Sequence, residues 1–227
     1  MTADGRELAG LAALVTGVDR PIGDGLARAL ADAGATVAVR GSHLDPVDNV
    51  FATARDELGA DVDVVVHAAL PPGAAELLAF EEVTDERWET VWERGMRTTL
   101  ALLQGAFPAM RERGRGRFVF VSPTLSMSGA PGLVPLTAYV EGQRLLAKSA
   151  ARQWGPYGIT VNCVAPAPEL AVAGTAAGAV SLAAPALGGP GDARDDLGPV
   201  VTFLASDAAH FVTGVTVCAD GGVWMAP

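Results

Sequence analysis

Residues 116–123 read Gly-Arg-Phe-Val-Phe-Val-Ser-Pro, and residues 158–166 read Gly-Ile-Thr-Val-Asn-Cys-Val-Ala-Pro. Each stretch is a short apolar run behind a glycine, which predicts buried strands at Arg117–Val121 and Ile159–Val164. The alanine-rich segment between them predicts a helix at Thr137–Gln153. A strand, a helix and a second strand in this order predict two parallel strands joined by a crossover.

The same alternation extends over the rest of the chain. Further strands are expected at Leu11–Thr16, Ala35–Arg40, Val62–Val66 and Val215–Ala219. Further helices are expected at about Gly23–Ala33, Val47–Leu58, Trp88–Arg113 and Asp196–Ser206. This pattern predicts an α/β fold with a doubly wound parallel sheet, and 227 residues with 50% hydrophobic content fit one domain, 1–227.

The composition argues against several classes of protein. The formal net charge is −10 and no dense basic face is present, so nucleic-acid binding is not expected, because phosphate contacts need clustered Lys and Arg. The only cysteines, Cys163 and Cys218, lie in strand-like runs without a CxxC motif or a His cluster. We therefore expect no metal site, and we interpret both residues as reduced core thiols of a cytoplasmic protein.

Two apolar stretches invite a membrane or export interpretation. The N-terminus carries Asp4 and Glu7, lacks a basic segment and leads directly into the first strand, so no signal peptide is expected. Residues 165–191 are apolar and nearly uncharged, but alanine is weakly hydrophobic and prolines interrupt the segment repeatedly. We interpret it as a lid-like surface segment and expect no membrane association. The prolines are Pro166, Pro168, Pro185 and Pro190.

Several motifs are shared with one known family. Residues 16–23 read Thr-Gly-Val-Asp-Arg-Pro-Ile-Gly, and the chain ends with Phe203-Leu-Ala-Ser-Asp207, Thr213-Gly214 and Asp220-Gly-Gly222. Together with residues 116–166, these motifs resemble the short-chain dehydrogenase/reductase family over almost the whole chain. The resemblance implies a Rossmann-like sheet, a nicotinamide dinucleotide, and ketone/alcohol interconversion on an acyl or polyketide-like substrate.

One part of the family's sheet is expected to be missing. The family places a helix, a short strand and a second helix between its second and fourth strands. Here only 21 residues separate Arg40 from Val62, and they hold one predicted helix. We therefore expect the third strand to be lost or vestigial.

The catalytic residues that the resemblance implies are absent from their expected positions. In the family a Tyr acts as the acid, a Lys four residues later lowers its pKa, a Ser holds the substrate oxygen, and an Asn supports a water relay. Counting from Asn162, and from Trp88 for the Asn, gives positions without a titratable group or a hydroxyl. These positions are Gly95, Pro123, Leu136 and Val140.

A displaced catalytic set is one alternative. Tyr139 stands near the expected Tyr position and Ser122 stands beside the expected Ser position. The fourth residue after Tyr139 is Gln143, which is neutral and cannot lower the pKa of a phenol as a cation does. The other interpretation is that Tyr139 is an ordinary helix residue at a subunit or pocket edge.

The predicted dinucleotide contacts begin at the glycine turn. Gly17, Ile22 and Gly23 are expected to face the pyrophosphate, because glycine lets the backbone approach and a helix N-terminus offers free N–H groups. Pro21 stands at the family's middle glycine and removes one N–H group. The alternative is a turn retained for the fold alone.

The adenosine side of this site departs further from the family. Arg20 and Arg40 are candidate cofactor contacts, and Arg20, with Gly41 in the place of an acid, favours NADP. The family's Asn-Asn-Ala-Gly reads His67-Ala-Ala-Leu70 here, so His67 and Ala68 are the further candidates. The alternative for His67 is a polar strand end without a ligand.

Three functional hypotheses follow. The first is a non-catalytic subunit that assembles with an active member of the family, or with itself, because the family builds dimers and tetramers through its two long helices and last strand. The second is an NADP-dependent oxidoreductase acting through Tyr139. The third is a repurposed ligand-binding or cyclase-type pocket without hydride transfer. The alternating Arg111, Arg113, Arg115 and Arg117 are interpreted as a solvated loop, or as a docking patch for an acyl carrier protein or acyl-CoA.

Overall fold

The computed structural model describes residues 6–44, 49–172 and 183–225 of the chain. These residues form a six-stranded sheet in the order β2-β1-β3-β4-β5-β6, and every neighbouring pair is parallel. The predicted doubly wound parallel sheet is confirmed. The strands are β1 (Ala12–Thr16), β2 (Thr36–Arg40), β3 (Val64–His67), β4 (Gly116–Val121), β5 (Ile159–Pro166) and β6 (Thr216–Ala219).

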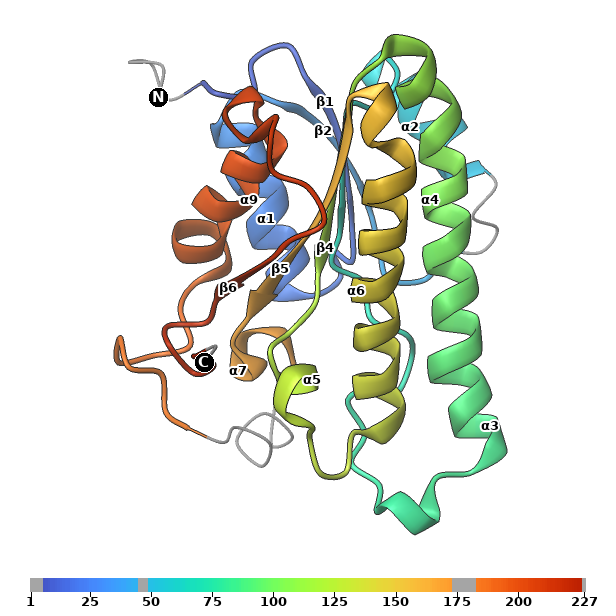
Figure 1. Cartoon of the computed structure of the whole chain (residues 1–227), viewed down its shortest axis with the longest axis vertical. Coiled ribbons are helices and arrows are strands. Elements are labelled where there is room, and N and C mark those ends of the chain that lie inside the picture. Colours follow the sequence, from blue (N-terminus) through green and yellow to red (C-terminus); the bar gives the residue numbers. More distant parts are fainter. Residues whose placement is uncertain (1–5, 45–48, 173–182, 226–227) are drawn as a thin grey trace.

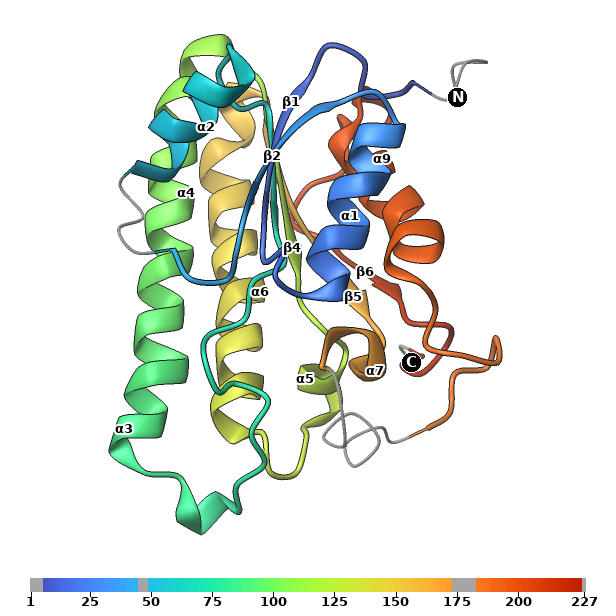
Figure 2. The same cartoon turned by 180° about the vertical axis from the view of Figure 1, so that it is seen from behind.

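Helices cover both faces of the sheet (Figure 1). On one face lie α1 (Pro21–Asp32) and α9 (Gly198–Ala205), and Figure 2 shows the other helices from behind. Those helices are α2 (Val50–Leu58), α4 (Arg94–Arg113) and α6 (Val134–Trp154). Alternate strand residues point to opposite faces, so the sheet builds a core on each side. Val64 and Val66 belong to one core, and Val65 belongs to the other.

Short elements connect these layers. They are η2 (Phe80–Glu82), α3 (Asp85–Trp88), η3 (Glu89–Glu93), α5 (Leu125–Ser128), η4 (Gly155–Tyr157), α7 (Pro168–Ala171), η5 (Ala193–Leu197) and η6 (Asp207–Ala209).

Among the described residues, β2 is an edge strand of the sheet and pairs only with β1. Between β2 and β3 the described residues hold one helix, α2, and no strand. The expected loss of the third strand therefore holds for the described part of this connection. Residues 45–48 of the connection lie outside the described residues.

The predicted helix Trp88–Arg113 is present as an unbroken helical run that begins three residues earlier, at Asp85, and contains a π turn. α3 ends at Trp88, η3 forms a π-helical turn, and α4 begins at Arg94. A π turn keeps the helix direction while adding a residue to the turn, so apolar periodicity alone does not reveal it. The predicted helix Asp196–Ser206 likewise begins with a π turn, η5, before α9.

Two further expectations need correction or restriction. Cys163 is buried as predicted, but Cys218 is exposed, because β6 is the other edge strand of the sheet. Both cysteines are free. The predicted lid, 165–191, begins with the end of β5 and α7, and its central residues 173–182 lie outside the described residues.

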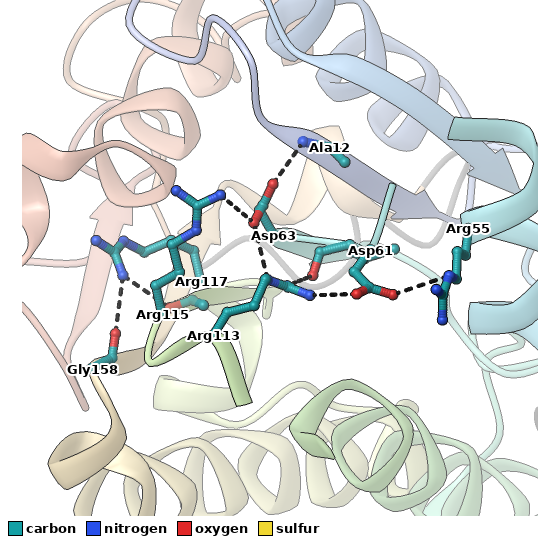
Figure 3. A network of polar contacts seen from close by, with 10 residues as sticks. Ala12, Arg55, Asp61, Asp63, Arg113, Arg115, Arg117 and Gly158 are labelled. Carbon is teal, nitrogen blue, oxygen red and sulfur yellow. Dashed lines mark hydrogen bonds and ion pairs between the residues drawn. The ribbon is translucent and has the colours of Figure 1, made fainter. Parts of the chain in front are cut away.

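An ion-pair network fastens the amino-terminal end of the sheet (Figure 3). The Asp63 carboxylate accepts a hydrogen bond of 3.1 Å from the Ala12 N–H group. The same carboxylate forms ion pairs of 3.6 Å with Arg113 and 3.2 Å with Arg115. Asp61 pairs with Arg113 at 3.2 Å. This network joins the first residue of β1, the approach to β3 and the end of α4.

The arginine run is therefore not simply a solvated loop. Arg117 lies at the edge of the same network and pairs with Asp207 at 3.2 Å. Arg111 instead lies 4.9 Å from the centre of the Tyr157 ring, which is a cation–π distance. Three of the four arginines thus have carboxylate partners within the chain, which weakens the case for a docking patch.

Among the described helices, none combines the length and apolar character that crossing a bilayer would require. Within residues 6–44, 49–172 and 183–225, no group of three or more His, Cys, Asp or Glu residues is placed to hold a metal ion.

Candidate functional site

The glycine turn joins β1 to α1 at the carboxyl-terminal end of the sheet. Gly17 has φ of 87°, and a Cβ there would lie 2.6 Å from the Ala68 carbonyl carbon. A Cβ on Gly23 would lie 2.2 Å from the Gly17 carbonyl oxygen. Both positions therefore require glycine for a close backbone approach. Ile22 and Gly23 lie in the first turn of α1, where N–H groups have no acceptor within the helix.

The side chains around this turn are already engaged. The Arg20 guanidinium donates a hydrogen bond to the Ala171 carbonyl of α7. Arg40 donates two 3.0 Å hydrogen bonds to Glu57 of α2. Both arginines, which we expected to contact a cofactor, thus have acceptors within the chain. Pro21 occupies the first position of α1, where a missing N–H group costs no helical hydrogen bond.

A carboxylate lies where the sequence predicted none. Asp19 Oδ1 accepts hydrogen bonds of 2.8 Å from the Ser42 N–H group and 2.7 Å from the Ser42 hydroxyl. Asp19 also approaches Gly41, since a Cβ there would lie 3.6 Å from the Asp19 carboxyl carbon. Gly41, whose lack of an acidic side chain favoured NADP in the sequence, therefore lies beside the negative charge of Asp19.

The pairing of β1 with β3 places a cluster of buried polar side chains beside the glycine turn. Thr16 of β1 pairs with His67 of β3, and both side chains point to the α4–α6 face. The Thr16 hydroxyl and His67 Nδ1 are 2.7 Å apart. His67 Nε2 lies 3.4 Å from the Tyr139 hydroxyl of α6, which links the strands to the helices. Ala68 contributes backbone only, with its N–H group donating to the Thr16 carbonyl.

The Tyr139 hydroxyl has two further partners. Gln143 Nε2 donates to it over 2.7 Å, and Thr99 Oγ1 of α4 lies 3.3 Å away. Thr99 in turn donates to the Gly95 carbonyl oxygen over 3.0 Å. Gln143 is apparent in the sequence from its position four residues after Tyr139. The roles of Thr16 and Thr99 are not apparent there, because the pairing of β1 with β3 and the packing of α4 on α6 do not show in linear spacing.

Burial determines the protonation of the two titratable side chains in this cluster, His67 and Tyr139. It raises the pKa of Tyr139 to about 12, an effect that hydrogen bonds from Thr99 and Gln143 partly oppose. Burial lowers the pKa of His67 to about 4. At neutral pH both side chains are therefore uncharged, and Tyr139, 1% exposed, is a weak acid.

The positions implied for catalysis are filled by apolar core. Leu136 and Val140 are fully buried among apolar side chains, and Pro123 is also buried. Ser122 is fully buried at the end of β4, and among the described contacts no hydrogen bond joins it to Tyr139. The two residues of the displaced catalytic set are therefore not brought into hydrogen-bonding distance.

A cavity of about 440 Å³ opens beside this cluster of polar side chains. Its walls come from the segment after β2, the loop after β3, and the side of α4 near η3. A second hollow of about 380 Å³ adjoins it and includes Asp19 and Arg20. The first cavity is lined by, among others, Ser42, His43, Leu44, His67, Ala69, Leu70, Thr90, Arg94, Arg97, Thr98, Ala101 and Tyr139.

Comparison with known proteins adds independent information. Residues 42–224 match the family model described as Enoyl-(Acyl carrier protein) reductase. The chain is 30% identical to 2-dehydro-3-deoxy-D-gluconate 5-dehydrogenase of Bacillus subtilis (strain 168), covering 98% of this chain and 97% of that protein. It is 29% identical to 3-oxoacyl-[acyl-carrier-protein] reductase FabG of Escherichia coli (strain K12), covering 95% and 98%.

A solved structure shows the same fold. A protein described as a short-chain alcohol dehydrogenase from Sinorhizobium meliloti 1021 superposes with a TM-score of 0.82 at 26% identity. The match covers 95% of this chain and 97% of that one. The likeness therefore extends over nearly the full length of both chains.

Proposed function

Because the chain belongs to the short-chain dehydrogenase/reductase family of oxidoreductases, we propose that it is a subunit without hydride-transfer activity of its own. The observation that carries this proposal is the burial of Leu136 and Val140 in the apolar core at the family's Tyr and Lys positions. Neither side chain can donate a proton to a carbonyl oxygen or stabilise a phenolate. The chain would assemble with an active member of the family.

Tyr139 does not supply the missing acid in this proposal. Its hydroxyl is buried among Gln143, Thr99 and His67, and its pKa is raised to about 12. An efficient general acid has a pKa closer to the working pH and reaches the reacting oxygen directly. Tyr139 is better explained as the centre of a structural hydrogen-bond cluster between β3, α4 and α6.

The surface of α4 and α6 supports assembly. The two helices lie side by side on the same face of the sheet in both views (Figures 1 and 2). Leu100 of α4 is 45% exposed and Leu145 of α6 is 66% exposed. Other apolar side chains of the same helices, such as Leu103 and Trp154, are buried within the chain. Leu100 and Leu145 are therefore the large apolar side chains that the described parts of α4 and α6 expose for assembly.

The residues present fit a dinucleotide only in part. The glycine turn and the first N–H groups of α1 suit a pyrophosphate. Asp19 beside Ser42 is unfavourable for the 2′-phosphate of NADP, although Arg20 led us to expect NADP. We propose that dinucleotide binding is weak, and that NADP remains the cofactor of the assembled complex.

The substrate of the complex is proposed from the relatives. The reductase of Escherichia coli is named for 3-oxoacyl-[acyl-carrier-protein]. An acyl thioester on a carrier protein or on CoA is accordingly the first substrate to test. The active subunit would reduce its ketone, while this chain completes the assembly.

The first test uses the purified chain alone. It is mixed with NADPH or NADH and a 3-oxoacyl thioester, and absorbance at the nicotinamide band is followed. No turnover is expected, because the acid, its cationic neighbour and the oxygen-holding serine are all missing. Turnover of about 1 s⁻¹ or faster, which is typical of working enzymes, would contradict the proposal.

The second test is co-expression with an intact family member, followed by light scattering and activity measurement. A mixed complex with an altered rate is expected. A Leu100→Glu/Leu145→Glu variant should lose the complex, because two charges would be buried in an apolar contact. The matched control is Leu187→Glu, since Leu187 is 88% exposed and lies outside α4 and α6. A clean monomer that never joins or alters the partner would refute the subunit role.

A further inference from the structure

The cavity beside α4 adjoins the connection between β2 and β3, which is shorter than the family pattern. It lies between Ser42–Leu44 after β2, Ala69–Pro72 after β3, and the first turns of α4. Between β2 and β3 the described residues hold one helix, α2, and no strand. This helix lies beside the later part of α4 (Figure 2). The first turns of α4 are therefore left to face the cavity. Its volume of about 440 Å³ is in the range of small-molecule sites.

The charged side chains that line this cavity among the described residues are positive, opposite in sign to the net charge of the chain. The protein carries a net charge of −10, yet no carboxylate is among the described residues that line the cavity. Arg94 and Arg97 line it, and neither guanidinium forms an ion pair or hydrogen bond with the described part of the chain. Two arginines three residues apart on one helix repel each other. An anion held between them would remove this repulsion.

The inner walls of the cavity are apolar. Leu44 and Leu70 are buried wall residues, and Ala101 adds a small apolar side chain from α4. Tyr139 and His67 also line the cavity, but their polar atoms are hydrogen-bonded to each other and to Thr16, Thr99 and Gln143. These rings therefore offer apolar surface rather than free donors.

An irregular turn adjoins the same wall. The π-helical turn η3 lies directly before Arg94, and its residue Thr90 lines the cavity. Isolated π turns inside helices occur frequently at functional sites. Here the turn places Thr90 beside the two arginines.

From these features we infer that the cavity binds a small organic anion, a carboxylate on an aromatic or branched apolar body. Arg94 and Arg97 would hold the charge, and the apolar walls would cover the body. This inference does not depend on the proposed subunit role, because that role rests on the burial of Leu136 and Val140. Neither of these residues lines the cavity, although Gly95 does. A nucleotide is less well suited, since Asp19 borders the adjoining hollow.

The test uses 1-naphthoate as the probe, with binding to the purified chain measured by calorimetry. Its neutral counterpart is 1-naphthalenemethanol. The Arg94→Gln/Arg97→Gln variant removes both charges from an exposed helix face, and Lys148→Gln/Arg152→Gln is the matched control on α6. Both control residues are exposed and outside the cavity. Circular dichroism checks that each variant is folded.

We expect naphthoate to bind the unmodified chain with saturation. The alcohol should bind this chain at least about tenfold more weakly, and the Arg94→Gln/Arg97→Gln variant should bind naphthoate at least about tenfold more weakly. A tenfold loss is typical of one charge-assisted contact. The control variant should stay within about twofold of the unmodified chain. An Ala101→Trp variant, which fills the cavity, should abolish binding of both probes.

Three results would overturn the inference. The first is the absence of naphthoate binding at concentrations up to about 10 mM, because a dissociation constant above this value would be too weak for a specific site. The second is equal binding of the alcohol, or undiminished binding to the Arg94/Arg97 variant. The third is tight binding of NADP or 2′-AMP that displaces naphthoate and depends on the same two arginines, which would make the cavity a nucleotide site.

Discussion

The ring of Tyr139 occupies the space in front of Gly95. A Cβ placed on Gly95 would lie 2.8 Å from Tyr139 Cε2 and 2.6 Å from Pro71 Cγ. The resemblance to the family places an Asn at position 95, and the side chain of such an Asn would meet the Tyr139 ring here.

Restoring the family residue should therefore damage the fold. Gly95→Asn is expected to lower the free energy of unfolding by about 1–3 kcal/mol, the usual cost of overpacking a core. Chemical denaturation measures the change. Gly155→Asn is the control, because Gly155 is helical and a Cβ there meets nothing within 4 Å.

A double-mutant cycle tests the cause. If the clash is with Tyr139, Gly95→Asn should cost less in a Tyr139→Ala background than in the unmodified chain. An equal cost in both backgrounds would assign the clash to Pro71 instead.

The sheet could be predicted from the sequence because its strands are short apolar runs separated by clear turns. The loss of the third strand was visible as a short connection between Arg40 and Val62. The π turn η3 was not visible, since Trp88, Val91 and Trp92 continue an apolar pattern that also suits an unbroken helix. Local periodicity specifies the elements, but not the irregular turns between them.

The candidate site could be predicted only where function depends on backbone. Gly17 and Gly23 were found because a close approach demands glycine. The partners of Tyr139 and His67 come from four separate elements, so their contacts arise from tertiary packing. Likewise, Arg40 looked available in the sequence, but Glu57 of α2 accepts its hydrogen bonds.

The buried His67 predicts a pH-dependent stability. Burial lowers its pKa to about 4, whereas an unfolded histidine titrates near 6.5. Between these values the unfolded chain binds more protons, so stability falls as pH drops from about 6.5 toward 4, by up to about 1.4 kcal/mol per pH unit. Urea denaturation across this range should show the slope.

The contribution of His67 is isolated by substitution. His67→Gln should flatten the slope between pH 6.5 and pH 4, because the titrating group is gone. His210→Gln should leave it unchanged, since His210 is exposed. Identical slopes in the His67 variant and the unmodified chain would show that other groups cause the pH dependence.

The ion-pair network at the other end of the sheet predicts a strong asymmetry between two aspartates. The Asp63 side chain is 10% exposed and contacts Ala12, Arg113 and Arg115. Asp63→Ala should cost about 1–3 kcal/mol, because it leaves the Ala12 N–H group without its acceptor and removes an ion-pair partner from Arg113 and Arg115. Asp207, whose side chain is 102% exposed, pairs with Arg117, and Asp207→Ala should cost less than about 1 kcal/mol. Similar losses for both variants in urea denaturation would contradict this assignment.

The Asp19 carboxylate beside Ser42 predicts a change of cofactor preference. A 2′-phosphate bound near Ser42 would face this carboxylate, and like charges at an interface are strongly unfavourable. Asp19→Asn keeps the oxygen that accepts from Ser42 and removes the charge. We expect NADPH affinity to rise by about tenfold while NADH affinity changes little, because only NADPH carries the extra phosphate. Calorimetry with both cofactors measures the ratio, and Asp24→Asn provides the same charge change on α1, where Asp24 pairs with Arg28. Equal gains for NADPH and NADH in the Asp19 variant would mean that the 2′-phosphate does not approach this carboxylate.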